Sequence, residues 1–78
     1  MYEIMLSQFI DDDDDVITVA ETDPAAVSVA MRTTGKIINV SADPKPCRPL
    51  GAEGFTELFV ACAQAAYAAR YDPLPAGD

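Results

Sequence analysis

The first part of the chain shows the period-two pattern of β-strands. Residues 2–10 (YEIMLSQFI) contain no Gly or Pro, and alternation places apolar side chains on both of their faces, which predicts a central strand or one at a subunit contact. Residues 16–21 (VITVAE) are rich in β-branched side chains and predict a second strand. Five consecutive Asp residues, 11–15, cannot continue a buried element and therefore predict the connecting loop.

Residues 24–35 are compatible with two different elements. Asp23 and Pro24 at one end and Gly35 at the other match the start and end of a helix. A hairpin with Thr34 and Gly35 as its loop would instead place nearly all the large apolar side chains on one face, through the pairs Val27–Ala42, Val29–Val40 and Met31–Ile38. The β-branched residues of this segment are poor helix formers, so we favour the hairpin and keep the helix as the alternative.

The pattern changes after residue 42. Three prolines in residues 43–51 (DPKPCRPLG) disfavour both helix and ladder hydrogen bonds and predict an ordered crossing loop. Apolar residues then recur at helical spacing from 52 to 71, with Glu53 and Glu57 in the first turns and Arg70 in the last. The members of this apolar stripe are Phe55, Leu58, Phe59, Cys62, Ala65, Ala66 and Ala69.

Together these elements predict the fold class. We expect a single α+β domain over residues 1–78, since a chain of this length holds one small core. Residues 1–42 form an antiparallel β-meander of three to four strands, and residues 43–51 are a Pro-rich loop. The C-terminal α-helix, residues 52–71, covers one face of the sheet, and residues 72–78 are a tail.

Composition and charge reduce the number of function classes that the chain can belong to. Half of the residues are apolar, so the chain folds, but 13 acidic residues against 5 basic ones give a net charge of −8. Nucleic acid and anionic membranes would repel such a chain, and a basic protein would attract it. The N-terminus lacks the basic region of a signal peptide, and no apolar run reaches the length of a membrane span. These features predict a cytoplasmic protein.

The sequence carries no pattern for catalysis, a metal or a cofactor. There is no His, and Cys47 and Cys62 do not form a C-x-x-C pair, so we expect free thiols in a reducing cytoplasm and no zinc site. Without His, neither the cysteines nor the serines have a base to activate them. We therefore expect a non-enzymatic protein without cofactors.

The run of Asp11, Asp12, Asp13, Asp14 and Asp15 is the most unusual local feature. It can be a solvated hairpin loop that keeps the protein in solution. It can also imitate nucleic-acid phosphates, because an extended chain rises about 3.3 Å per residue and one DNA strand carries a phosphate about every 3.4 Å. A calcium loop is disfavoured, since the run lacks the alternating ligand spacing, the glycine and the distal Glu of such loops.

An acidic chain under 80 residues without motifs, with a predicted meander over 16–21, 27–32 and 36–41 and an Ala-rich helix over 55–70, resembles the small phage-encoded anti-CRISPR proteins. This resemblance implies an inhibitor in the host cytoplasm, monomeric or homodimeric. It would bind the basic surface with which a CRISPR effector complex, or another nucleic-acid-binding protein, engages DNA. The implied contact residues are the five Asp of residues 11–15, with Glu21 and Asp23 as additions. The alternative is a small phage structural or assembly protein that oligomerises through apolar surface.

Overall fold

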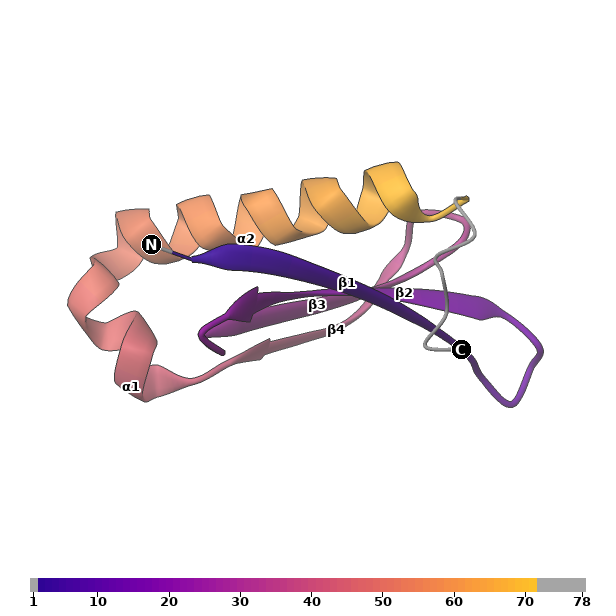
Figure 1. Ribbon diagram of the computed structural model, residues 1–78, viewed down its shortest axis with the longest axis horizontal. Helices are drawn as coiled ribbons and strands as arrows, with labels where there is room; N and C mark the ends of the chain where they lie inside the picture. The colour runs from indigo at the N-terminus through magenta and orange to yellow at the C-terminus, as the bar shows by residue number, and fades with distance from the viewer. Residues whose placement is uncertain (1, 72–78) are drawn as a thin grey trace.

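A single antiparallel sheet and one long helix make up the fold (Figure 1). The computed structural model describes residues 2–71. Strands β1 (Glu3–Ile10), β2 (Val16–Asp23), β3 (Val27–Arg32) and β4 (Ile37–Ala42) lie side by side in sequence order. Two short helices, α1 (Pro44–Cys47) and η1 (Arg48–Leu50), lead into the 19-residue helix α2 (Gly51–Ala69). The predicted α+β meander with a C-terminal helix is confirmed, while the predicted tail, 72–78, lies outside the described residues.

The β3–β4 hairpin is present, and the alternative helix over residues 24–35 is wrong. Val27 pairs with Ala42 and Val29 with Val40, as predicted. Beyond this point the register shifts, because a β-bulge makes Met31 face Ile37 rather than the predicted Ile38.

The loop of this hairpin has three residues, 33–35, rather than the predicted two. The N–H of Gly35 donates to the carbonyl of Arg32 at 2.8 Å, and the N–H of Arg32 donates to the carbonyl of Lys36 at 2.9 Å. Gly35 has a φ of 95°, in the left-handed region that a loop of this kind requires at its third position. A two-residue loop would also require a positive φ at Thr34, whereas the three-residue loop requires it only at Gly35.

The predicted crossing loop over 43–51 is wrong, because most of this segment is helical. Asp43 caps α1: its side chain accepts a hydrogen bond from the N–H of Lys45 at 3.0 Å. Pro44 occupies the first turn, where a helix needs no N–H donor and proline's fixed φ is favourable. The prolines therefore help to start short helices here.

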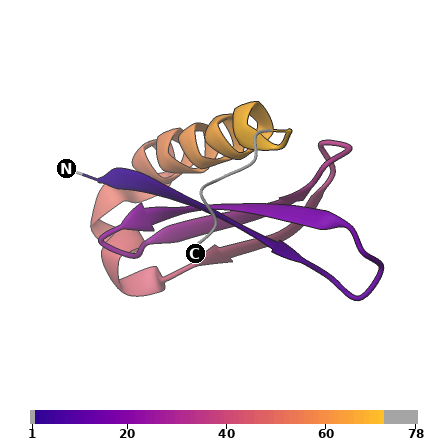
Figure 2. The same ribbon diagram turned by 45° about the vertical axis from the view of Figure 1, so that its right-hand side comes forward.

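Helix α2 covers the middle of the sheet. It packs on β3 and β2 and makes a smaller contact with β1 (Figure 2). Cys62 and Ala66 are fully buried on its inner face, where their small side chains let the helix approach Ala20, Val29 and Met31 of the sheet. Neither α1 nor α2, among the described residues, has the length and apolarity needed to cross a membrane.

The two outer strands keep exposed apolar side chains. Strand β1 is an edge strand, so the predicted central position is wrong, and Met5 and Phe9 on the face away from α2 are about half exposed. At the other edge, every residue of β4 is exposed, because this strand lies outside the main contact area of α2. The core is therefore concentrated on β2 and β3.

Candidate binding site

The five-Asp segment, called here the acidic loop (residues 11–15), is a tight turn between β1 and β2. The N–H of Asp11 donates to the carbonyl of Asp15 at 3.0 Å, and the N–H of Asp14 donates to the carbonyl of Asp11 at 3.1 Å. Asp14 has a φ of 63°, the left-handed conformation that Asp tolerates better than most residues. The chain therefore reverses within three residues, and the extended spacing that would match a phosphate backbone is wrong.

The carboxylate of Asp11 orders this turn. Its Oδ1 accepts the N–H of Asp13 at 2.9 Å and the N–H of Asp15 at 3.0 Å. The N–H of Asp15, and then the N–H of Asp13 and the guanidinium of Arg32, lower the pKa of Asp11 from its usual value of 3.8, against an opposing effect of desolvation. Asp11 is thus a structural carboxylate of the loop rather than a free contact residue.

Arg32 at the end of β3 neutralises part of the charge. Its Nη1 donates to Asp11 Oδ2 at 3.1 Å and to Asp15 Oδ2 at 2.5 Å. The contact is possible because β3 follows β2 in the sheet and Arg32 pairs with Ile17, close to the acidic loop. The sequence analysis missed this residue. The predicted order of strands could have indicated it. A meander brings its first and third loops to the same end of the sheet, and Arg32 directly precedes the third loop.

The remaining three carboxylates form the free tip of the loop. Asp12, Asp13 and Asp14 are all exposed, as expected for the residues that protrude furthest. Within residues 2–71, no side-chain hydrogen bond or ion pair holds any of these carboxylates. The loop therefore presents three negative charges on a backbone that Asp11 and Arg32 hold in place.

Glu21 and Asp23 do not join this site. They lie near the far end of β2, and eight residues of strand rising about 3.3 Å each separate its two ends by roughly 23 Å. Glu21 is in register with Ser28, and Ser28 with Ser41, so these side chains form a row on the face of the sheet away from α2. The predicted set of acidic contact residues is thus divided between two ends of the molecule.

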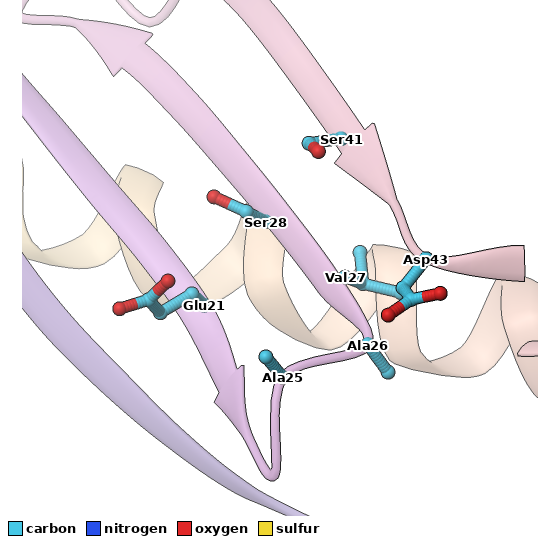
Figure 3. Close-up of a pocket in the computed structure, with 7 residues that line it drawn as sticks. All are labelled: Glu21, Ala25, Ala26, Val27, Ser28, Ser41 and Asp43. Atoms are coloured by element: carbon cyan, nitrogen blue, oxygen red, sulfur yellow. The ribbon is translucent and has the colours of Figure 1, made fainter. Parts of the chain in front are cut away.

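A shallow hollow of about 140 Å³ lies at that second end (Figure 3). Figure 3 shows the carboxylates of Glu21 and Asp43 on opposite sides of the small side chains of Ala25, Val27 and Ser28. Asp43 was not among the predicted site residues. The part of the chain described by the structure holds no group of three or more acidic, His or Cys side chains placed to bind a metal ion.

The two cysteines are free thiols with structural surroundings. Cys62 is fully buried, and desolvation by burial raises the pKa of its thiol, which disfavours the reactive thiolate. The Sγ of Cys47 donates to the carbonyl of Ala26 at 3.4 Å and so ties α1 to the start of β3. The surroundings of both cysteines therefore indicate a structural role.

Comparison with known proteins gives no relative. The chain matches no protein-family model, no curated protein and no solved structure. The physical features of the molecule are therefore the basis for assigning a function.

Proposed function

We propose that this protein is a non-enzymatic inhibitor that uses the tip of the acidic loop to bind a basic, nucleic-acid-binding surface of another protein. One observation carries the proposal: Asp11 and Arg32 hold the loop in a single turn while the carboxylates of Asp12, Asp13 and Asp14 are left exposed. A loop that is already ordered loses little conformational entropy when it binds. Three charges on such a loop therefore give useful affinity for a cationic surface.

The net charge of −8 supports the same proposal. A strongly negative protein is steered towards a positive surface, so association is fast and weakens as salt rises. Surfaces lined with Lys and Arg that normally contact phosphates are the natural targets. The resemblance to small acidic anti-CRISPR proteins names a specific candidate, the DNA-binding surface of a CRISPR effector complex in the host cytoplasm.

The test is a DNA-binding assay with purified CRISPR effector complexes. The protein should prevent a complex from shifting its target DNA on a native gel, and added salt should weaken this inhibition. Replacing Asp12, Asp13 and Asp14 together by Asn should abolish or strongly reduce the effect. The matched control replaces Glu3, Glu53 and Glu57 by Gln, because these exposed residues carry the same total charge away from the loop.

The two variants separate local from global charge. Loss of inhibition in the loop variant alone supports contact through the acidic loop. Equal loss in both variants would attribute the effect to net charge, and full inhibition by the loop variant would contradict the proposed site. A protein inactive against every complex tested would remove the CRISPR target from the proposal.

The second candidate, a small structural or assembly protein, is favoured by a different observation. Large apolar side chains are exposed on both edge strands, including Phe9 and Ile10 of β1 and Ile37 and Val40 of β4. Patches of this kind mark surfaces that associate with other proteins. A large, defined oligomer that persists in the Asp12, Asp13 and Asp14 variant would favour this function over inhibition.

A further inference from the structure

Strand β4 combines an open edge with an apolar, uncharged sequence. Its six residues, IINVSA, are all exposed, with Ile37 and Ile38 at 39% and Val40 at 44%. The strand forms one edge of the sheet and lies outside the main contact area of α2, which packs on β2 and β3 (Figures 1 and 2). An uncharged strand with a free edge is a template for pairing with another strand.

The backbone of β4 shows which groups are available at this edge. The N–H of Asp43 donates to the carbonyl of Ala26, so the N–H of Asp43 is directed towards β3. Because inward and outward positions alternate along antiparallel strands, Ser41 also bonds to β3, whereas the N–H and C=O groups of Val40 and Ala42 point away from it. Of these two outward positions, Val40 is the nearer to the middle of β4.

We infer that β4 pairs antiparallel with β4 of a second copy of this chain, around a two-fold axis at Val40. In this register the two Val40 residues face each other and exchange both of their outward N–H and C=O groups, as in a hydrogen-bonded antiparallel pair. The two four-stranded sheets join into one continuous sheet. This inference holds independently of the function proposed above.

Charge complementarity at the ends of β4 selects this register. Asp43 lies three residues after Val40, and Lys36 lies four before it. The segment between Lys36 and Val40 contains the extra residue of the β-bulge. Ala30 pairs with Asn39, but the next residue of β3, Met31, pairs with Ile37, so Ile38 has no partner of its own on β3. Lys36 and Asp43 are therefore equally far from the axis, so each Lys36 lies opposite Asp43 of the second copy.

These two side chains also belong to the same face of the joined sheet. Lys36 bonds to Arg32, which pairs with Ile17 on the face away from α2, and Asp43 continues the alternation of Ser41 on that face. Both are exposed in the single chain. The two-fold axis thus creates two ion pairs around an otherwise uncharged interface.

The other edge of the sheet does not offer this complementarity. Strand β1 is flanked by Glu3 at its start and by the acidic loop at its end, and residues 1–15 contain no Lys or Arg. Antiparallel pairing of β1 with itself would bring carboxylates of the two copies together, which is destabilising. The charge pattern therefore favours β4 over β1 as the dimer edge.

Apolar surface next to β4 would be covered in the same dimer. A groove of about 380 Å³ lined by Met31, Ala63, Gln64 and Tyr67 lies between α2 and β3. It borders β4, since Met31 pairs with Ile37, and Val40 shares this face of the sheet with Val29. In the proposed register the Val40 side chains of the two copies lie side by side at the axis, on this same face of the sheet.

The test measures the mass of the whole chain in solution by sedimentation equilibrium, from micromolar to millimolar concentration. We expect a dimer of twice 8.3 kDa at the upper end of this range. Val40→Pro should give a monomer with an unchanged far-ultraviolet circular dichroism spectrum. It removes only an N–H that points away from β3, and proline is tolerated at such edge positions.

Two further variants make the result specific. Leu6→Pro is the matched control, because Leu6 is a non-hydrogen-bonded position of β1 on the opposite edge, and it should leave the dimer intact. Lys36→Asp should raise the dimer dissociation constant at least tenfold, and adding Asp43→Asn, which removes the facing charge but can still cap α1, should restore part of the affinity. A wild-type chain that stays monomeric up to 1 mM would overturn the inference. So would a dimer that survives Val40→Pro, or one that Leu6→Pro abolishes.

Discussion

Arg32 and Asp11 are 21 residues apart in the sequence, yet Nη1 of Arg32 lies 3.1 Å from Oδ2 of Asp11. The same Asp11 carboxylate accepts two backbone N–H groups of its own loop. A single carboxylate thus connects the turn between β1 and β2 to the end of β3. The three carboxylates at the tip of the loop, Asp12, Asp13 and Asp14, remain exposed.

Removing the guanidinium should loosen the loop without unfolding the protein. In Arg32→Gln we expect the amide hydrogens of Asp13 and Asp15 to exchange several-fold faster, because Asp11 and Asp15 then repel each other without an intervening cation. The midpoint of urea unfolding should change little, since the pair is partly exposed. Arg48→Gln removes the same charge from η1 and should leave both amides unchanged. Equal exchange rates in all three proteins would contradict this role of Arg32.

The order of the loop should depend on pH through Asp11. Its folded pKa lies below the unfolded value of 3.8, so its contribution to stability is present above about pH 3.8 and is lost as pH falls through the lowered value. The side-chain carboxyl carbon of Asp11, followed by nuclear magnetic resonance, should therefore titrate with a midpoint below 3.8. Asp11→Asn should lose less stability than the wild type over this acidic range. A midpoint at or above 3.8 would contradict the hydrogen bonding described for Asp11.

Periodicity was sufficient to predict most of the fold. The alternation in residues 16–21 and 27–32 and the helical spacing from Phe55 to Ala69 depend only on which side chains must be buried, and these elements are present. The pairing of Val29 with Val40 followed from the same rule. The bulge opposite Met31 was not predictable in this way, because it accompanies a loop of three residues, 33–35, which begins one residue earlier than the predicted loop of Thr34 and Gly35.

The site was only partly predictable for a related reason. Sequence identifies the acidic loop as charged, but a count of carboxylates contains no information on distance, and Glu21 proved to lie at the other end of β2. The role of Arg32 depends on the order of the strands in space. Local rules also misled at Pro44, where proline starts a short helix because Asp43 caps it.

The two three-residue loops of the sheet predict opposite effects of substitution at equivalent positions. Asp14 and Gly35 both hold the left-handed conformation, with φ of 63° and 95°. Gly35→Ala should lower the free energy of unfolding by about 1–2 kcal/mol. Its Cβ would also lie 3.0 Å from the Cε2 atom of Tyr67, so the ring must move.

Asp14→Gly should instead raise the free energy of unfolding by about 0.5–1 kcal/mol. Glycine relieves the strain of the left-handed conformation, and its greater entropy in the unfolded chain offsets part of this gain. Urea denaturation measures both changes. Gly35→Asn is the control, because Asn tolerates positive φ and should cost less than Ala. A Gly35→Ala variant as stable as the wild type would contradict the conformation described for this loop.

The hydroxyl of Thr22 fixes the turn between β2 and β3. Thr22 is only 2% exposed, and its Oγ1 accepts the N–H groups of Ala26 at 2.7 Å and Val27 at 3.1 Å while donating to the carbonyl of Pro24 at 2.9 Å. Thr22→Val keeps the shape of the side chain but leaves these buried groups without a partner. We expect the free energy of unfolding to fall by about 2–4 kcal/mol, since each unsatisfied buried group costs about 1–3 kcal/mol.

The control for this prediction is Thr56→Val on the exposed side of α2. The hydroxyl of Thr56 donates to the carbonyl of Ala52 at 2.8 Å, but both residues are exposed, so water replaces the lost hydrogen bond and the change should stay within about 0.5 kcal/mol. Thr22→Ser keeps the hydroxyl and should retain more stability than Thr22→Val, although it removes a buried methyl group. A Thr22→Val variant more stable than Thr22→Ser would show that methyl packing, and not the hydroxyl, holds this turn.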